Sequence, residues 1–315
     1  MVCKMKTRFN FSKTCLLAIV VLCGSQSVWA HGKVGKRLFL EPLTAADANV
    51  KNELDLPRFE FLSQPGGWAQ TLSYSFEKEL YPGRISFVLG QDHVRQPGAG
   101  GMNLSGWDNL DAGMKWEAYK NAAHEFAFSP ALFVTLPTGN SRITTRQTVW
   151  QPMLLFAKGM GDLHRGWLRP LALQGDVGYA RSSSGPRTRQ AIYDLVLEYS
   201  LPYLNQWVRH ANAGYRTDDT LRTGWRPGAI LGDLLPFVEI NSTQAIEHTP
   251  GGKTTFVRPG VAYMGSYFQI SAAWERVVSG PPGIIGRSGG VILGDLFLDD
   301  IVPALRWTPW GQSPE

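Results

Sequence analysis

The chain repeats one pattern many times: long stretches in which apolar and polar residues alternate, five of them especially clear. In residues 125–136, apolar residues such as Phe126 and Phe128 alternate with smaller or polar ones such as Ser129. Successive side chains of a β-strand point to opposite faces, so this pattern predicts strands with one apolar and one polar face. It recurs at 84–90, 109–118, 171–179 and 267–275. Helical spacing fits none of these stretches, and the chain is predicted to be all-β.

Two folds use such strands: a soluble sandwich or calyx with an apolar interior, and a membrane barrel with an apolar exterior. The predicted strands approach the roughly 10 residues that a tilted membrane strand needs. Their polar faces carry charges of both signs. Large aromatic residues gather near strand ends, as in the aromatic girdles of barrels, at Trp68, Tyr81, Trp107, Trp150, Trp167, Tyr263 and Tyr267. These features favour the membrane barrel.

The spacing of the strands predicts a closed antiparallel transmembrane β-barrel. We place strands at 56–64, 67–79, 84–93, 106–119, 124–136, 147–158, 167–180, 189–201, 233–244, 254–264, 267–277 and 289–299. Short connections at 80–83, 120–123, 159–166 and 265–266 alternate with long ones at 94–105, 137–146, 180–188, 245–253 and 278–288. About twelve strands, an even number, are expected of a single-chain bacterial barrel, with both termini on the periplasmic side.

Residues 1–30 are predicted to be a secretory signal peptide. Basic residues precede an apolar run at 15–23, and Val28-Trp29-Ala30 places cleavage before His31. Lipid attachment at Cys23 is the alternative, although Leu22 stands where a small residue is usual. No later stretch approaches the roughly 20 consecutive apolar residues that a membrane-spanning helix requires.

All three cysteines, Cys3, Cys15 and Cys23, lie in this signal. A chain cleaved before His31 therefore has no disulfide, no thiolate metal site and no cysteine nucleophile. Cleavage also removes four basic residues and lowers the formal net charge from +5 to +1. A nucleic-acid partner is not expected at that charge.

Two segments depart from the alternation. Residues 31–55 are charged and mixed, and we expect an N-terminal periplasmic extension or a plug inside the barrel. Residues 202–231 interrupt the barrel, which is otherwise assigned to 56–310 with a tail at 311–315. Within the interruption, Leu204, Trp207 and Val208 have helical spacing, so the segment is either a short interfacial helix or a loop.

The sequence shows no catalytic signature, and no enzyme activity or cofactor is expected. The six histidines lack metal-ligand spacing, and no G-x-S-x-G or phosphate-loop motif is present. His124 and Ser129 are an odd number of positions apart and point to opposite faces of a strand. The one metal hypothesis is copper at His31, whose α-amine and imidazole can chelate Cu(II) after cleavage.

Charged residues on the polar strand faces are the candidate lumen-lining residues. They are Asp111, Lys115, Glu117, Asp176, Asp194, Glu198, Glu239, Arg258 and Glu275. They either pair with one another and with water, or form a constriction that selects solutes by charge. Acidic residues outnumber basic ones by seven to two in this set, which predicts a neutral or mildly cation-favouring pathway.

Five segments resemble a family of bacterial outer-membrane barrels grouped with the phenol-degradation MetA pathway. They are HGKVGKRLF at 31–39, GWDNLDAGMKW at 106–116, FAKGMGDL at 156–163, LEYSLPYL at 197–204 and LFLDDIVP at 296–303. The resemblance implies a transporter-like barrel and supplies no catalytic residues. Such barrels usually end on an aromatic residue, whereas here Trp310 is followed by five more residues.

Together these features predict an exported protein of the bacterial outer membrane that passes small compounds, including hydrophobic or aromatic ones. Its expected partners are membrane lipid, the barrel-assembly machinery and the solute. The first alternative is a structural or adhesin-like barrel with a filled lumen. The second is a soluble periplasmic β-protein that binds copper through His31.

Overall fold

The computed structural model describes residues 33–98, 103–145, 147–183, 188–205, 230–246, 252–265 and 267–311. The expected signal peptide and His31 lie outside the described residues, as do 206–229 of the interruption. Nearly all regular structure in the described part is β, apart from short helical turns. No helix in that part is long and apolar enough to cross a membrane.

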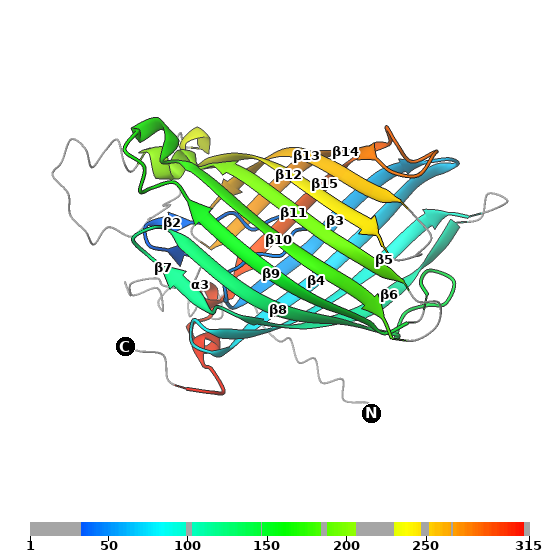
Figure 1. Cartoon of the computed structure of the whole chain (residues 1–315), viewed down its shortest axis with the longest axis horizontal. Helices are drawn as coiled ribbons and strands as arrows, with labels where there is room; N and C mark the ends of the chain where they lie inside the picture. Colours follow the sequence, from blue (N-terminus) through cyan, green and yellow to red (C-terminus); the bar gives the residue numbers. More distant parts are fainter. Residues whose placement is uncertain are drawn as a thin grey trace, which may run out of the picture.

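Twelve long strands form one closed antiparallel sheet (Figure 1). Each strand pairs with its neighbours in sequence, β15 pairs with β3, and β6 pairs with β8. The three-residue strand β7 (Tyr119–Asn121) adds to β8. The long strands are β3 (Glu53–Gln64), β4 (Gly67–Tyr81), β5 (Ile85–Pro97), β6 (Asn103–Trp116), β8 (Phe126–Leu136), β9 (Val149–Gly159), β10 (Leu171–Ser182), β11 (Arg189–Tyr199), β12 (Leu234–Ala245), β13 (Lys253–Met264), β14 (Phe268–Ser279) and β15 (Ser288–Phe297).

This architecture confirms the predicted fold class, since each of the twelve expected strands has a counterpart. The bounds differ by up to four residues at most strand ends. Strand β3 begins at Glu53 rather than 56, and β8 begins at Phe126 because Glu125 has a φ of 46°, outside the strand region. The last strand ends at Phe297 rather than 299.

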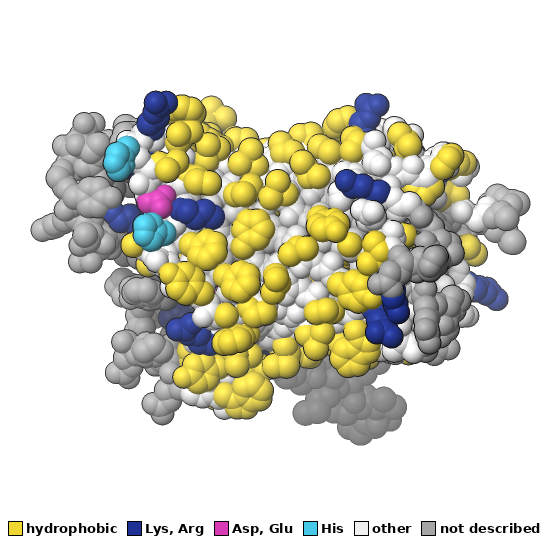
Figure 2. Space-filling view, viewed as in Figure 1, with side chains coloured by type: hydrophobic (Ala, Val, Ile, Leu, Met, Phe, Trp, Pro, Cys, Tyr) yellow, Lys and Arg dark blue, Asp and Glu magenta, His cyan; other side chains and the backbone are white. Residues whose placement is uncertain are grey.

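The polarity of the barrel is inverted relative to a soluble protein. In β14, Gln269, Ser271 and Glu275 are buried, whereas the alternating Ile270 and Trp274 are about half exposed. The large apolar side chains that are exposed come from nearly all of the long strands, and the face in Figure 2 is covered by apolar side chains with Lys and Arg gathered towards both ends. The outside of the barrel is therefore apolar, and most of the buried charged residues belong to the wall or to the segment that it encloses.

The two ends of the barrel carry exposed aromatic residues. We call the end where β4 joins β5 and β13 joins β14 the turn end, and the end where β5 joins β6 and β8 joins β9 the loop end. Exposed aromatics at the loop end are Trp68, Trp107 and Trp150, and those at the turn end include Tyr81, Trp116, Trp167 and Tyr267.

A short segment follows the last strand at the turn end. It contains α3 (Leu298–Ile301) and η4 (Pro303–Arg306). The backbone N–H of Trp310 donates to the carbonyl of Leu80 over 2.9 Å, and the Trp310 ring is exposed. Two further helical turns, η2 (Gly166–Leu168) and η3 (Ile230–Asp233), also lie between strands at this end.

Candidate functional site: a plug inside the barrel

Residues 33–52, which we call the plug, lie inside the turn-end half of the barrel. The plug begins with the hairpin of β1 (Lys33–Val34) and β2 (Arg37–Leu38), which Figure 1 draws at the turn end. Residues 43–46 bind side chains at the middle of β10 and β12, and residues 47–52 return towards the start of β3. The sequence left an extension and a plug as alternatives, and these contacts lie within the barrel.

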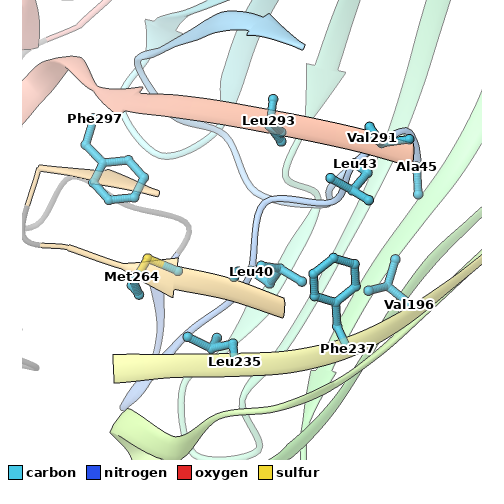
Figure 3. Close-up of a cluster of buried hydrophobic side chains, with 11 residues drawn as sticks. Leu40, Leu43, Ala45, Val196, Leu235, Phe237, Met264, Val291, Leu293 and Phe297 are labelled. Carbon is cyan, nitrogen blue, oxygen red and sulfur yellow. The ribbon is translucent and has the colours of Figure 1, made fainter. Parts of the chain in front are cut away.

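Apolar plug residues pack against apolar residues on the inner wall. Leu40, Leu43 and Ala45 are buried in a cluster that strands β11 to β15 complete (Figure 3). The wall residues of this cluster are Val196, Leu235, Phe237, Ala262, Met264, Val291, Leu293 and Phe297. Burial of a leucine side chain contributes about 1.5–3 kcal/mol, so this cluster favours a docked plug.

A second apolar cluster holds the other side of the plug. Val34, Phe39 and Ala48 are buried against strands β8, β9 and β10. The wall contributes Ala127, Ala131, Met153, Leu155, Ala157 and Ala172. The plug therefore contacts two adjoining arcs of the barrel, one formed by β8 to β10 and the other by β11 to β15.

Carboxylates on the wall bind the backbone of the plug. Glu239 accepts hydrogen bonds from the N–H groups of Leu43, Thr44 and Ala45 over 2.7, 2.8 and 3.0 Å. The plug is irregular between residues 40 and 52, so its N–H groups need partners from elsewhere. A hydrogen bond to a charged group contributes about 1.5–3 kcal/mol, which makes Glu239 a principal anchor.

Further wall side chains complete this binding. Glu198 accepts from the N–H of Leu40 over 2.9 Å, and Asp176 accepts from the N–H of Ala46 over 2.9 Å. Gln269 both accepts and donates, since its Oε1 accepts a hydrogen bond from the N–H of Glu41 and its Nε2 donates one to the Glu41 carbonyl. The Nε2 of Gln174 donates to the carbonyl of Leu40 over 2.8 Å.

Arg37 fixes the hairpin to the turn end. Its Nε donates to Oε2 of Glu125 over 3.0 Å, its Nη1 donates to the carbonyl of Pro170 over 3.0 Å, and its Nη2 donates to that of Arg169. The guanidinium lies 4.3 Å from the ring centroid of Tyr203, whose hydroxyl donates to Oε1 of Glu125 over 2.8 Å. Arg37 is fully buried, so these partners replace water around its charge.

Gly159 permits this close packing. A Cβ atom at this position would lie 2.2 Å from Oε2 of Glu125 and 2.3 Å from Nε of Arg37. Only glycine fits there without displacing the ion pair.

Two lysines connect acidic groups of the plug and the wall. Nζ of Lys115, on β6, lies 2.6 Å from Oδ1 of Asp47 and 2.6 Å from Oε2 of Glu77, and it donates to the carbonyl of Asn49 over 2.7 Å. Nζ of Lys51, in the plug, contacts Glu41, Asp47 and Glu53.

Burial and neighbouring charges shift the pKa values of two plug carboxyl groups in opposite directions. Burial raises the pKa of Glu41 well above its ordinary value, and the charge of Glu53 adds to this effect against the attraction of Lys51. Burial also acts to raise the pKa of Asp47, but Lys115 and Lys51 outweigh it and hold that pKa below its ordinary value.

All nine predicted lumen-lining residues face inward. Eight of them lie in strands, and Glu117 directly follows β6. Asp111 is exposed, and Asp194 is half-buried. The remaining seven are buried: Lys115, Glu117, Asp176, Glu198, Glu239, Arg258 and Glu275. Nε of Arg258 donates to Oε2 of Glu275 over 2.6 Å, and Glu117 pairs with Lys120 over 3.2 Å. Most of these charges bind the plug or one another.

Sequence reasoning did not identify Arg37, Glu77, Gln174 or Gln269 as site residues. A usable signal was present, because strands β12 and β15 contain runs that are apolar on both faces, at 234–238 and 291–293. Such runs indicate burial on both sides of a sheet, as a filled lumen requires.

Comparisons with known proteins support the fold. No model of a protein family matches the sequence, and no curated protein matches it. A structure of the NanC porin matches 78% of this chain and 98% of its own, with 9% identity and a TM-score of 0.50. The COG4313 outer membrane channel from Pseudomonas putida F1 matches 82% of this chain and 99% of its own, with 14% identity and a TM-score of 0.44. The chain thus has the closed twelve-strand antiparallel barrel fold of a porin.

Proposed function

We propose that this protein is exported to the bacterial outer membrane and acts there as a passive channel whose plug controls passage. The observation that carries this proposal is the polarity of the barrel, whose exposed outer face is apolar and whose strand charges, such as Asp176, Glu198 and Glu239, are buried inside. A soluble calyx has the opposite arrangement. Outer-membrane lipid and the barrel-assembly machinery are the partners that the proposal implies.

The two sets of exposed aromatic residues support membrane insertion. Trp68, Trp107 and Trp150 lie at the loop end, and Tyr81 and Trp167 lie at the turn end. Amphipathic rings favour the headgroup level of a bilayer. The apolar face between them matches the hydrocarbon layer.

The inner wall beyond the plug supports a pathway for solutes. Asp92, Asp111 and Asp194 retain partial or full exposure there. Their charges favour cations or neutral solutes over anions. Small hydrophobic or aromatic compounds are the proposed solutes, on the basis of the family resemblance. Because the plug occupies the turn-end half, passage requires the plug to move.

Liposome swelling with solutes of graded size tests this proposal. Purified protein should pass small neutral aromatic compounds, and a variant with a weakened plug should pass them faster. In planar bilayers, reversal potentials that favour anions would contradict the proposed selectivity. Migration on a denaturing gel provides the membrane-barrel test, since closed barrels resist unfolding until they are boiled.

The alternative is a structural or adhesin-like barrel with a permanently filled lumen. The burial of Glu239, Glu198 and Arg37 between plug and wall favours this candidate. It predicts no swelling with any solute, for the native protein and for plug variants alike. A soluble copper-binding protein, the remaining alternative, would leave the membrane pellet in a carbonate wash.

A further inference from the structure

Three acidic residues lie close together where the plug contacts β3, the first long strand. Glu41 belongs to the plug, and Glu53 and Asp55 belong to β3. One carboxylate oxygen from each of these residues lies within 4.8 Å of the corresponding oxygens of the other two. Carboxylates repel one another at such distances unless a cation or a proton separates them.

A fourth carboxyl group, that of Asp295, adjoins these three. Asp295 on β15 pairs directly with Asp55 in the β3–β15 ladder, so both side chains point to the same, inward face. Asp295 is 0% exposed, and neither of its carboxylate oxygens has a hydrogen-bond partner. Its charge interacts with those of Glu53, Glu41 and Asp55. Oδ1 of Asp55 is also buried without a partner.

The cationic groups nearby do not balance this charge. Lys51 contacts Glu41 and Glu53, and Asp47 lies 3.3 Å from the same ammonium group. Arg58 attracts Asp55, but its Nη atoms donate to the carbonyl of Leu43 over 2.6 Å and to Oγ of Ser73 over 2.8 Å. Burial of an unpaired carboxylate is strongly unfavourable, so the cluster has the charge and the free oxygens to bind a cation.

We propose that Glu41, Glu53, Asp55 and Asp295 bind one Ca²⁺ ion. The ligand set consists of oxygen atoms only, which suits hard divalent cations and not the softer metals that prefer thiolate or imidazole. Four carboxylates that can each bind through one or two oxygens match the flexible coordination of Ca²⁺ better than the rigid octahedron of Mg²⁺.

The ion would fasten the plug to the barrel. Glu41 comes from the plug, whereas Glu53, Asp55 and Asp295 come from the two strands that close the sheet. Calcium would therefore stabilise the docked plug and the β3–β15 pairing together. This proposal concerns binding and does not rest on the passage of solutes.

Calcium binding by the purified full barrel in detergent tests the site. The protein is first treated with a chelator and then titrated with CaCl₂ in a calorimeter at neutral pH. We expect one site per chain. Asp295→Asn and Asp55→Asn should each weaken binding at least about tenfold, because ligand charge sets calcium affinity. Asp111→Asn, which removes an inward carboxylate outside the cluster, is the matched control and should bind as the wild type does.

Thermal unfolding separates a lost ligand from a lost fold. In chelator, Asp295→Asn should unfold at a higher temperature than wild type, because the substitution removes an unpaired buried charge. Calcium should raise the unfolding temperature of wild type but not of this variant. Absence of calcium binding by wild type, tighter binding of Mg²⁺ than of Ca²⁺, or undiminished binding by Asp295→Asn would overturn the proposal.

Discussion

Nε of Arg37 donates to Oε2 of Glu125 over 3.0 Å, across a sequence separation of 88 residues. The first residue belongs to the plug hairpin and the second to the turn before β8. Because both side chains are buried, this ion pair resists competition from water and salt better than a surface pair would.

Arg37→Met should release the hairpin. The variant leaves Glu125 buried without its cation, and breaking a buried ion pair costs about 3–5 kcal/mol. A single-cysteine reporter at the buried plug position Ala48, placed in the otherwise cysteine-free chain after residue 30, measures the effect. Its reaction with a thiol reagent should become about a hundredfold faster or more. The double variant with Glu125→Gln should recover part of this loss, and equal rates in wild type and Arg37→Met would refute the anchoring role.

Glu239→Gln should weaken the attachment of the plug loop. An amide presents one acceptor oxygen and one donor group, so it cannot accept the three N–H groups that the carboxylate binds. We expect a loss of about 1.5–3 kcal/mol in docking free energy, read as faster labelling of the Ala48→Cys reporter. Asp111→Asn is the control, and its labelling rate should match that of the parent reporter.

Leu43→Ala should destabilise the docked plug by about 2–5 kcal/mol, because it leaves a cavity in the cluster of Figure 3. Leu231→Ala is the matched control, since Leu231 is 77% exposed whereas Leu43 is 1% exposed. Reporter labelling should accelerate in the first variant only. An equal effect of both substitutions would indicate that the Leu43 side chain is not packed as described.

Val177→Arg should destabilise the barrel in lipid vesicles by about 2–4 kcal/mol, the cost of an arginine at the bilayer midplane. Val278→Arg should cost only about 0–1 kcal/mol, because Val278 lies at the loop end of β14. The two valines are 43% and 49% exposed, so a soluble protein would tolerate both changes alike. Denaturant titration in vesicles compares them, and equal losses would argue against a membrane-spanning barrel.

Plug docking should weaken as pH rises above the ordinary pKa of a glutamate, in the presence of chelator. The folded-state pKa of Glu41 is raised above its ordinary 4.5, chiefly by burial. Its contribution to docking is therefore fully present below that value and lost as pH rises through the raised pKa. The ratio of labelling rates between the Ala48→Cys reporter and the same reporter with Glu41→Gln removes the pH dependence of the thiol. We expect this ratio to increase as pH rises above 4.5 and through the raised pKa of Glu41; a constant ratio would contradict the assignment.

The strands could be predicted from sequence because each strand residue faces either the outside of the barrel or its interior, and the two faces alternate along the chain. Ile270 and Trp274 face outward, Glu275 faces inward, and this alternation is visible in the sequence itself. Glu125 was placed in a strand because its polarity fits the alternation, but its positive φ belongs to a turn. The pattern of polarity does not record such backbone conformations.

The path of the plug could not be predicted in the same way. Residues 33–52 have no period, and their partners are distant in sequence, as for Leu43 and Glu239 at a separation of 196 residues. The inward orientation of Glu239 can be predicted from the alternation of polarity. The identity of its hydrogen-bond partner, Leu43, can be read only from the folded structure. The alternation places these charges on the wall, but their binding to the plug depends on tertiary structure.

The large separation between Leu43 and Glu239 has a consequence for biogenesis. The plug is synthesised before every strand that anchors it, and the pairing of β3 with β15 joins the first long strand to the last. Contacts so remote in sequence form late, since they require long loops to close. The N-terminal segment therefore remains without its binding partners until the last strands are synthesised. It becomes enclosed only when the β3–β15 pairing closes the barrel.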